Sequence, residues 1–205
     1  MEIIFQHMDN THFTTAEKAV SKTKDEIIKE AQRIEESALY SAKGHFVAAN
    51  FWTNFHLWIG IPMVLLAAIA GASALSQFDP KHIVAGIISI IVAALSGVMT
   101  FLNPNEKAST HLNAGNNYDA LQNKVRMFWS IDCWKEESEQ VLTEKLKYFS
   151  EQKDRLNQSS PQIPRWAYQR AKKGILEGEA DYKVDNEKKD LPPSSAEPSN
   201  PAGRD

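Results

Sequence analysis

The sequence predicts an all-α membrane protein, in which a hairpin of two transmembrane helices is flanked by long amphipathic cytosolic helices. Three observations support this fold class. Residues 44–78 and 82–105 contain no Asp, Glu, Lys or Arg. A short linker separates these two windows, and the segments on either side of them carry apolar residues at helical spacing. Whole-chain averages conceal this pattern, since 24% of the 205 residues are charged.

The overall composition excludes several classes of protein. The chain has 23 Lys and Arg against 26 Asp and Glu, which gives a formal net charge of −3. A nucleic-acid-binding protein would be clearly basic, so we expect no nucleic-acid partner. The single cysteine, Cys133, rules out a disulfide framework and a CxxC metal site.

The residues before the first window form an amphipathic segment. We expect a flexible N-terminus at residues 1–14 and a cytosolic amphipathic helix at 15–54. Thr14 and Glu17 match a capping box, in which the hydroxyl and the carboxylate each satisfy a free backbone N–H. Apolar residues then recur every three to seven positions, namely Val20, Ile27, Ala31, Ile34 and Ala38. A helix with such a stripe needs a partner surface.

The two windows contain the predicted spans, residues 55–75 and 83–102. A helix of about 20 residues rises about 30 Å, which matches the hydrocarbon thickness of a bilayer. The alternative is a buried hairpin in a soluble protein, but core helices of that kind are shorter and keep a polar stripe. Both segments are apolar on every side, so we predict membrane spans.

The linker at residues 76–82 defines the topology. Seven residues with an Asp79-Pro80 turn signal force an antiparallel hairpin, so both termini lie on one side of the membrane. Basic residues near the spans are concentrated on the terminal side, at Lys43, Lys107, Lys124 and Arg126, whereas the linker has only Lys81. This bias favours cytoplasmic termini.

Small residues mark both spans. They recur every four positions in the second span, at Ala85, Ser89, Ala93 and Gly97, and more loosely in the first, at Gly60, Ala67, Gly71 and Ala74. Small residues let helices approach closely in lipid. Two alternatives stay open: they seal the hairpin itself, or they pack between subunits, because two helices alone cannot enclose an aqueous path.

Other features of the spans restrict the mechanism. Gly60 and Pro62 predict a kink or soft point in the first span. Neither span contains a charged residue, which argues against a proton relay, a voltage sensor or a coupled transporter. A pore would therefore have a wall of small, apolar and hydroxyl-bearing residues, the last being Ser73, Ser89, Ser96 and Thr100.

Residues 103–178 are expected to form a cytosolic helical bundle, followed by a disordered tail at 179–205. Pro104 is placed to start a helix after Asn103. Its seam follows a coiled-coil spacing, and Trp129–Trp134 interrupts it before a further helix at about 136–157. A last short helix opens at Pro164. The residues that we expect to act in packing or signalling on this side are Asn103, Pro104, His111, Tyr118, Leu121, Arg126, Phe128, Trp166 and Tyr168.

No catalytic constellation is visible in the sequence. Phosphate-binding, zinc-protease and nucleophile-elbow motifs are all missing, so we expect no enzyme, no cofactor and no metal. His111 lies on the seam, where we favour a hydrogen-bonded interfacial histidine over a pH sensor or ligand contact. Cys133 is interpreted as a small packing residue. For Tyr118 and Arg126 we favour packing and pairing between helices over ligand binding.

Two segments carry a resemblance to a known family. Residues after the second span, among them Asn103-Pro104, Glu106-Lys107-Ala108 and Arg126-Met127-Phe128, together with the late stretch 161–168, resemble the SLATT-domain family. These proteins are the SMODS and SLOG-associating two-transmembrane effectors of bacterial conflict systems. The resemblance covers roughly residues 20–178, and the order of its short motifs around a two-span hairpin makes it specific.

The resemblance implies a defence effector of the bacterial inner membrane. It implies that the spans form a homo-oligomeric pore, or otherwise disrupt that membrane, when a partner senses invasion, causing growth arrest or cell death. The implied partners are a separately encoded sensor or a nucleotide-signal synthase, besides the lipid bilayer. The alternative function is a membrane-anchored helical scaffold that recruits a partner without forming a pore.

Overall fold

The computed structural model describes residues 2–75, 83–135 and 137–182, with side chains from residue 22 onward. Within these ranges the chain is helical apart from short connections, and no strand occurs among them. Two of the helices include stretches long and apolar enough to cross a membrane, which confirms an all-α membrane protein. The predicted linker at 76–82 and the tail beyond 182 lie outside the described residues.

Helix α1, Glu2–Leu75, is one continuous helix of 74 residues. At 1.5 Å per residue it is about 110 Å long. It begins within the segment that we assigned to a flexible N-terminus and passes without a break from the amphipathic segment into the first span. Pro62 lies inside α1, which continues through it. Water-side and membrane parts are therefore joined by an uninterrupted helix.

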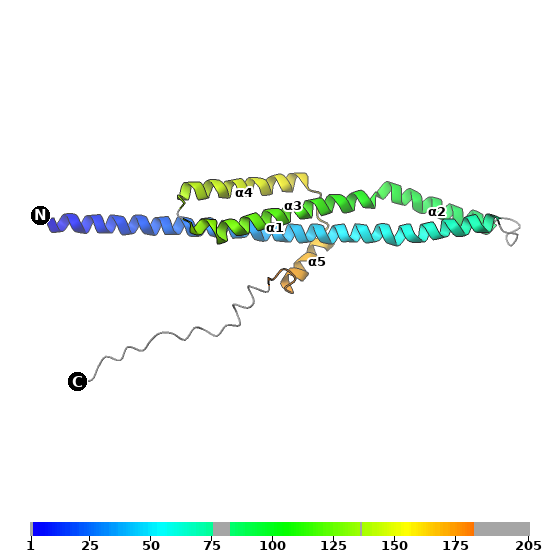
Figure 1. Ribbon diagram of the computed structural model, residues 1–205, viewed down its shortest axis with the longest axis horizontal. Coiled ribbons are helices and arrows are strands. Elements are labelled where there is room, and N and C mark those ends of the chain that lie inside the picture. Colours follow the sequence, from blue (N-terminus) through cyan, green and yellow to red (C-terminus); the bar gives the residue numbers. More distant parts are fainter. Residues whose placement is uncertain (1, 76–82, 136, 183–205) are drawn as a thin grey trace, which may run out of the picture. The chain divides into compact units, whose positions relative to one another are not determined.

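Helix α2, Ile83–Leu102, runs antiparallel beside the end of α1 (Figure 1). Their closest packing is between small residues, since Ala70 and Ala85 are the buried members of the two spans. Most other span residues are exposed, and Leu75 and Phe101 reach 90% and 89% exposure. Surfaces this apolar are stable only in lipid or against another apolar surface.

A single residue separates the second span from the water-side helices. Asn103 has φ 42° and ψ 58°, the left-handed conformation that asparagine tolerates better than most residues. Its Oδ1 accepts a hydrogen bond from the Glu106 N–H, at 3.4 Å, and its amide donates to the Glu106 carboxylate. Pro104 then occupies the first turn of α3, Pro104–Ser130, where its missing N–H costs nothing.

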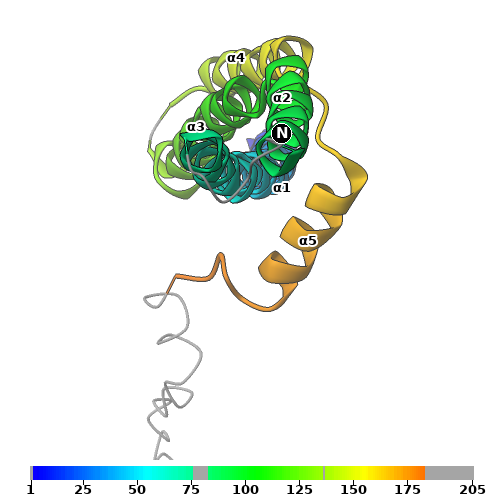
Figure 2. The ribbon, with the colours of Figure 1, turned by 90° about the vertical axis from the view of Figure 1, so that its right-hand side faces the viewer.

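The core of the water-side bundle lies mainly between α1 and α3. Its α1 side is a stripe of small and β-branched residues, and its α3 side is dominated by larger ones; the buried members are Ile27, Ala31, Ile34, Ala38 and Ala42 on α1, and Tyr118, Leu121, Val125 and Phe128 on α3. The view along the helices shows α3 and α4 grouped beside α1 (Figure 2).

Helix α4, Glu139–Ser159, closes this core. It follows a 3-10 turn, η1, Asp132–Trp134, so the chain is interrupted where the sequence predicts it. Leu142 of α4 is buried at 1% exposure, and Cys133 of η1 is fully buried. Burial raises the pKa of the Cys133 thiol, which lowers the fraction of reactive thiolate.

Helix α5, Arg165–Leu176, is the last helix, and the chain divides into two compact units at residue 172 within it. In the first unit Ala167 and Ala171 are buried. In the second unit Gly178 adopts φ 87°, a conformation that favours glycine.

The first prediction concerns Gly115 of α3. A Cβ atom added there would lie 2.7 Å from Phe46 Cε1 on α1. Gly115→Ala should therefore lower the stability of the bundle by roughly 1–3 kcal/mol, although the same change normally favours a helix. Thermal unfolding in detergent, followed by circular dichroism, measures this loss.

Gly86→Ala is the matched control, because a Cβ there meets nothing within 4 Å. In a Phe46→Ala background, Gly115→Ala should no longer lower the stability, because the ring that the added Cβ would meet is gone. A Gly115→Ala protein that melts at or above the wild-type temperature would contradict the close contact.

Candidate functional site

The small residues of the second span do not all face the first span. The side of α2 against α1 is formed by Ala85 together with the half-buried Ile88, Val92, Leu95 and Met99. An α-helix turns about 100° per residue, so residues spaced four apart shift about 40° around the helix at each step. We call the series Ala85, Ser89, Ala93 and Gly97 the ladder. Ala85 is buried, whereas Ser89, Ala93 and Gly97 are exposed. The ladder starts in the hairpin interface and winds onto the outer surface.

The outer part of this ladder belongs to a wider sector of α2. By the same rotation, residues 86, 89, 93, 96, 97 and 100 fall within about 100° of one another, and all of them are Gly, Ala, Ser or Thr. We call this set the small-residue face. Thr100 Oγ1 donates a hydrogen bond to the Ser96 carbonyl, at 2.9 Å, so that hydroxyl is satisfied inside the helix. The rest of the exposed surface of α2 is mostly Ile, Val and Phe.

The first span shows the same arrangement. Ala67, Gly71 and Ala74 are exposed and Gly60 is half-buried. A Cβ atom added at Gly60 or Gly71 would meet nothing within 4 Å, and the same is true of Gly97 on α2. The hairpin's own packing therefore leaves these positions unused. Small residues on an outward surface are what a close contact with another helix requires.

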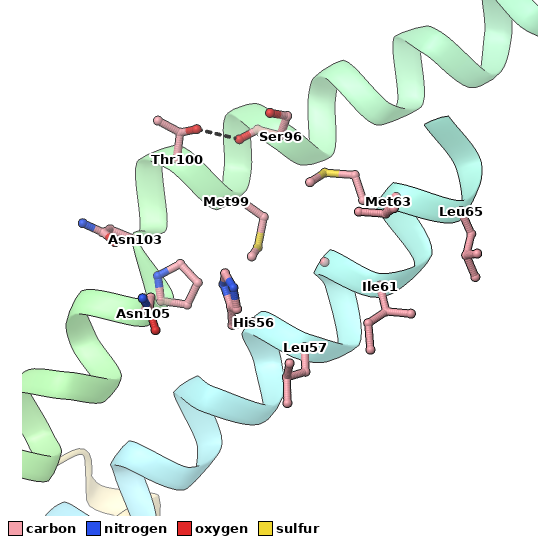
Figure 3. A pocket seen from close by; sticks show the side chains of 13 residues that line it. His56, Leu57, Ile61, Met63, Leu65, Ser96, Met99, Thr100, Asn103 and Asn105 are labelled. Atoms are coloured by element: carbon pink, nitrogen blue, oxygen red, sulfur yellow. Dashed lines mark hydrogen bonds between the residues drawn. The ribbon is translucent and has the colours of Figure 1, made fainter. Parts of the chain in front are cut away.

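The spans are loosely packed at the end that leads into α3. A crevice of about 670 Å³ opens there between α1 and α2. Figure 3 shows the flexible side chains of Met63 and Met99 in the gap between the helices, with His56 beside Met99. Gly60 contributes no side chain to fill it. The two spans are thus held together firmly near Ala70 and Ala85 and weakly near the membrane exit.

A buried pair of histidines lies about 15 Å along α1 from the start of the first span. Nδ1 of His45 and Nδ1 of His111 are 2.9 Å apart, so one ring donates a hydrogen bond to the other. The two side chains are 1% and 6% exposed. Burial and the neighbouring His111 lower the pKa of His45 to about 4, and burial lowers the pKa of His111. Both rings are therefore neutral at neutral pH.

Tyr118 extends this pair into a network that joins three helices. Its ring stacks on His45, with centroids 5.6 Å apart and planes 15° from parallel. Its hydroxyl donates to Oδ1 of Asn157 on α4, at 2.7 Å. Burial raises the pKa of Tyr118, so the hydroxyl stays protonated as a donor. The network fixes α1, α3 and α4 in one register.

The other residues that the sequence singled out fall in different places. Leu121 and Phe128 are in the buried core, and Arg126 is half-buried on α3. Trp166 packs on Phe51, with ring centroids 4.8 Å apart, and Tyr168 lies 6.2 Å from Tyr40. The structure therefore brings His111 and Tyr118 together and places the other residues elsewhere.

Sequence reasoning missed His45. The signal was present, because His45 follows Ala42 by three positions and continues the apolar stripe of α1. A histidine on that stripe has to be buried and hydrogen-bonded. In the part of the chain with described side chains, no group of three or more His, Cys, Asp or Glu is placed to hold a metal ion.

Comparison with known proteins gives one family. A model of the SMODS and SLOG-associating 2TM effector domain family 4 matches residues 25–187. The searches of curated proteins and of solved structures found no match. The matched range includes both spans, the histidine pair and helices α3, α4 and α5.

The second prediction concerns the pH dependence of stability. The folded pKa of His45, about 4, lies below its ordinary value of 6.5, so the unfolded chain binds the proton more readily. The stabilisation is complete above about pH 6.5 and is lost as the pH falls towards 4. Melting temperatures in detergent should decline over this interval.

The double variant His45→Leu/His111→Leu is the control, and its stability should fall less steeply with decreasing pH. Each single variant leaves one imidazole buried without its partner, which costs about 1–3 kcal/mol. Equal slopes for the wild type and the double variant would show that the pair does not titrate as described.

Proposed function

The chain belongs to the SMODS and SLOG-associating 2TM effector domain family 4, and on this premise we propose that it oligomerises in the bacterial inner membrane and permeabilises it when triggered. Membership of this family makes it a membrane effector of a conflict system. In our proposal the conflict is viral infection, and the outcome is growth arrest or death of the infected cell. The oligomer forms a pore or otherwise disrupts the bilayer.

The outward small-residue face of α2 carries this proposal. Lipid chains are as apolar as Leu side chains, so spans associate by close packing and not by the hydrophobic effect. Ser89, Ala93 and Gly97 would permit such packing, yet α1 does not use them. In a homo-oligomer, the hairpin of a second subunit would pack against this face. In this arrangement Ala85 seals the hairpin and the remaining ladder joins subunits.

The hydroxyl-bearing edge of this face supplies the wall of a pore, beside the Gly and Ala positions that join subunits. Ser96 and Thr100 share it with Ser89, so an assembly built on this surface brings hydroxyl groups together without any charged group. A wall of this kind conducts when it is wide and closes by dewetting when it narrows. This behaviour would allow gating by a small movement of the helices.

The continuous α1 couples the cytosolic bundle to this gate. Because α1 has no flexible joint, a trigger that shifts α1 against α3 also moves the first span. The crevice at the membrane exit offers the spans room to move, since Met63 and Met99 can repack at low cost. Both termini, and with them the bundle, lie in the cytoplasm in this proposal.

The trigger comes from a partner protein. The family is named for its association with SMODS and SLOG proteins, so we assign the trigger to a separately encoded sensor or nucleotide-signal synthase. No enzymatic step of the effector itself is part of the proposal.

The third prediction tests the small-residue face. Gly97→Leu and Ser89→Leu should abolish depolarisation of the inner membrane in infected bacteria that express the chain with its neighbouring genes, because a bulky residue keeps subunits apart. A potential-sensitive dye measures the effect, and chemical crosslinking should show a matching loss of oligomers.

Ala94→Leu is the matched control. Ala94 is exposed, and it lies about 60° beyond the edge of the small-residue face, among bulky residues. This variant should behave as the wild type does. A membrane that keeps its potential while growth stops would contradict permeabilisation altogether.

The fourth prediction separates an effector from a scaffold. Replacing residues 55–102 with an unrelated two-span anchor preserves attachment to the membrane but removes both small-residue surfaces. The exchanged protein should bind its partner and fail to depolarise the membrane. Full protection against infection by the exchanged protein would favour the alternative function, a membrane-anchored scaffold.

A further inference from the structure

Helix α5 has the composition of a membrane-surface helix. Its sequence is RWAYQRAKKGIL, with four cationic residues, one tryptophan, and no Asp or Glu. A short basic amphipathic helix with an aromatic anchor, next to a transmembrane segment, is suited to anionic lipid headgroups. Composition alone does not locate the helix, but its contacts with α1 do.

Contacts within the first compact unit orient the start of α5 across α1. Ile163, just before α5, packs on Gly44, where an added Cβ would lie 3.0 Å from Ile163 Cγ2. Trp166 contacts Phe51, whereas Tyr168 lies against Tyr40. These two α1 positions are roughly 16 Å apart along the helix axis. Two neighbouring α5 side chains thus reach in opposite directions along α1, and Trp166 reaches towards the membrane.

Trp166 is held close to the boundary of the hydrocarbon. Phe51 precedes the first span, which starts at residue 55, by one helical turn, or about 6 Å. At the same level Trp52 carries the Lys107 ammonium over its ring, with Nζ 4.5 Å from the centroid. Tryptophan and lysine at this depth are typical of the membrane–water interface, where the ring stays partly buried and the charge reaches the headgroups.

Basic groups of α5 flank Trp166. Arg170 follows Trp166 by four residues and lies on the same face of the helix. Arg165 is its neighbour in sequence, and both arginines are exposed. Guanidinium groups bind phosphate oxygens in pairs of hydrogen bonds. We define the interfacial belt as Trp52, Lys107, Arg165, Trp166 and Arg170.

We propose that the interfacial belt binds the headgroups of anionic phospholipids in the membrane that the hairpin spans. Charge complementarity selects this occupant, because the belt contains three cations, and the neighbouring carboxylate of Glu106 already accepts a hydrogen bond from the Asn103 amide. Trp166 and Lys107 are held near headgroup depth by Phe51 and Trp52. The inference requires only that the hairpin be in a membrane, so it holds whether or not the subunits form a pore. Lipid binding would fix α5 to the bilayer surface and set the depth of α1.

The fifth prediction tests lipid preference. The full chain is reconstituted in nanodiscs that contain equal amounts of phosphatidylglycerol and phosphatidylcholine, and the lipids retained after extraction are counted by native mass spectrometry. The wild type should retain phosphatidylglycerol preferentially. Arg165→Gln/Arg170→Gln should reduce that preference roughly tenfold or more, because each cation near the surface contributes about a factor of five.

The control variant removes the same charge elsewhere. Lys124→Gln/Lys147→Gln changes two exposed residues of α3 and α4, which lie several Debye lengths from the membrane by their helical rise. It should retain phosphatidylglycerol as the wild type does. No preference in the wild type, an undiminished preference in the arginine variant, or an equal loss in the control would overturn the proposal.

A second measurement reports on Trp166 and does not depend on charge. In vesicles of phosphatidylglycerol brominated near the glycerol backbone, tryptophans at the interface are quenched. Trp166→Phe should remove part of the quenched fluorescence, whereas Trp134→Phe, at an exposed position of η1 far along the bundle, should remove only unquenched fluorescence. Quenching that is unchanged in Trp166→Phe would place this residue away from the membrane, in a site for a protein partner.

Discussion

A bilayer interior offers no partner for an unpaired backbone N–H or C=O, and this constraint shapes the rest of the molecule. A span must be helical throughout its length, and here the helical state extends far beyond the hydrocarbon, because α1 continues as the water-side helix without a cap or a turn. The second span ends instead in a compact cap at Asn103 and Pro104, where the left-handed asparagine satisfies the first turn of α3. One leg of the hairpin is therefore rigidly joined to the bundle and the other is hinged to it.

Small residues act in opposite ways on the two sides of the membrane boundary. In the bundle they face inward: Ala31, Ala38 and Ala42 of α1 are buried, and Gly115 of α3 accommodates the Phe46 ring. The hydrophobic effect drives these surfaces together, so the small residues there set the distance between helices. In the spans they face mostly outward, where the solvent provides no such drive and close approach is itself the source of stability. The bundle thus buries these small residues within one chain, whereas the hairpin leaves most of its small residues exposed.

The fold class, the break at Asn103-Pro104 and the interruption before α4 could be predicted because each depends on local signals, namely charge-free length, a proline in the first turn and a run of residues that break the seam. Which faces of the helices meet, and in which register, could not be predicted in this way. The ladder from Ala85 to Gly97 looks uniform in sequence, yet its rotation carries it out of the hairpin interface. His45 and His111 are 66 residues apart, and periodicity identifies each stripe but not which positions meet. The crossing of α5 over α1 depends on side-chain contacts that no local pattern encodes.

The histidine pair gives the bundle a preferred register, and this bears on how movement reaches the membrane. Apolar side chains on a seam can slide past one another with little penalty, but two buried imidazoles that satisfy each other lose their hydrogen bond on any slide of α1 against α3. Each unsatisfied ring then costs about 1–3 kcal/mol. Because α1 is rigid, the next register would displace the first span by about one helical turn, 5.4 Å. Small displacements of α1 against α3 are therefore resisted, because any slide has to break the histidine pair first.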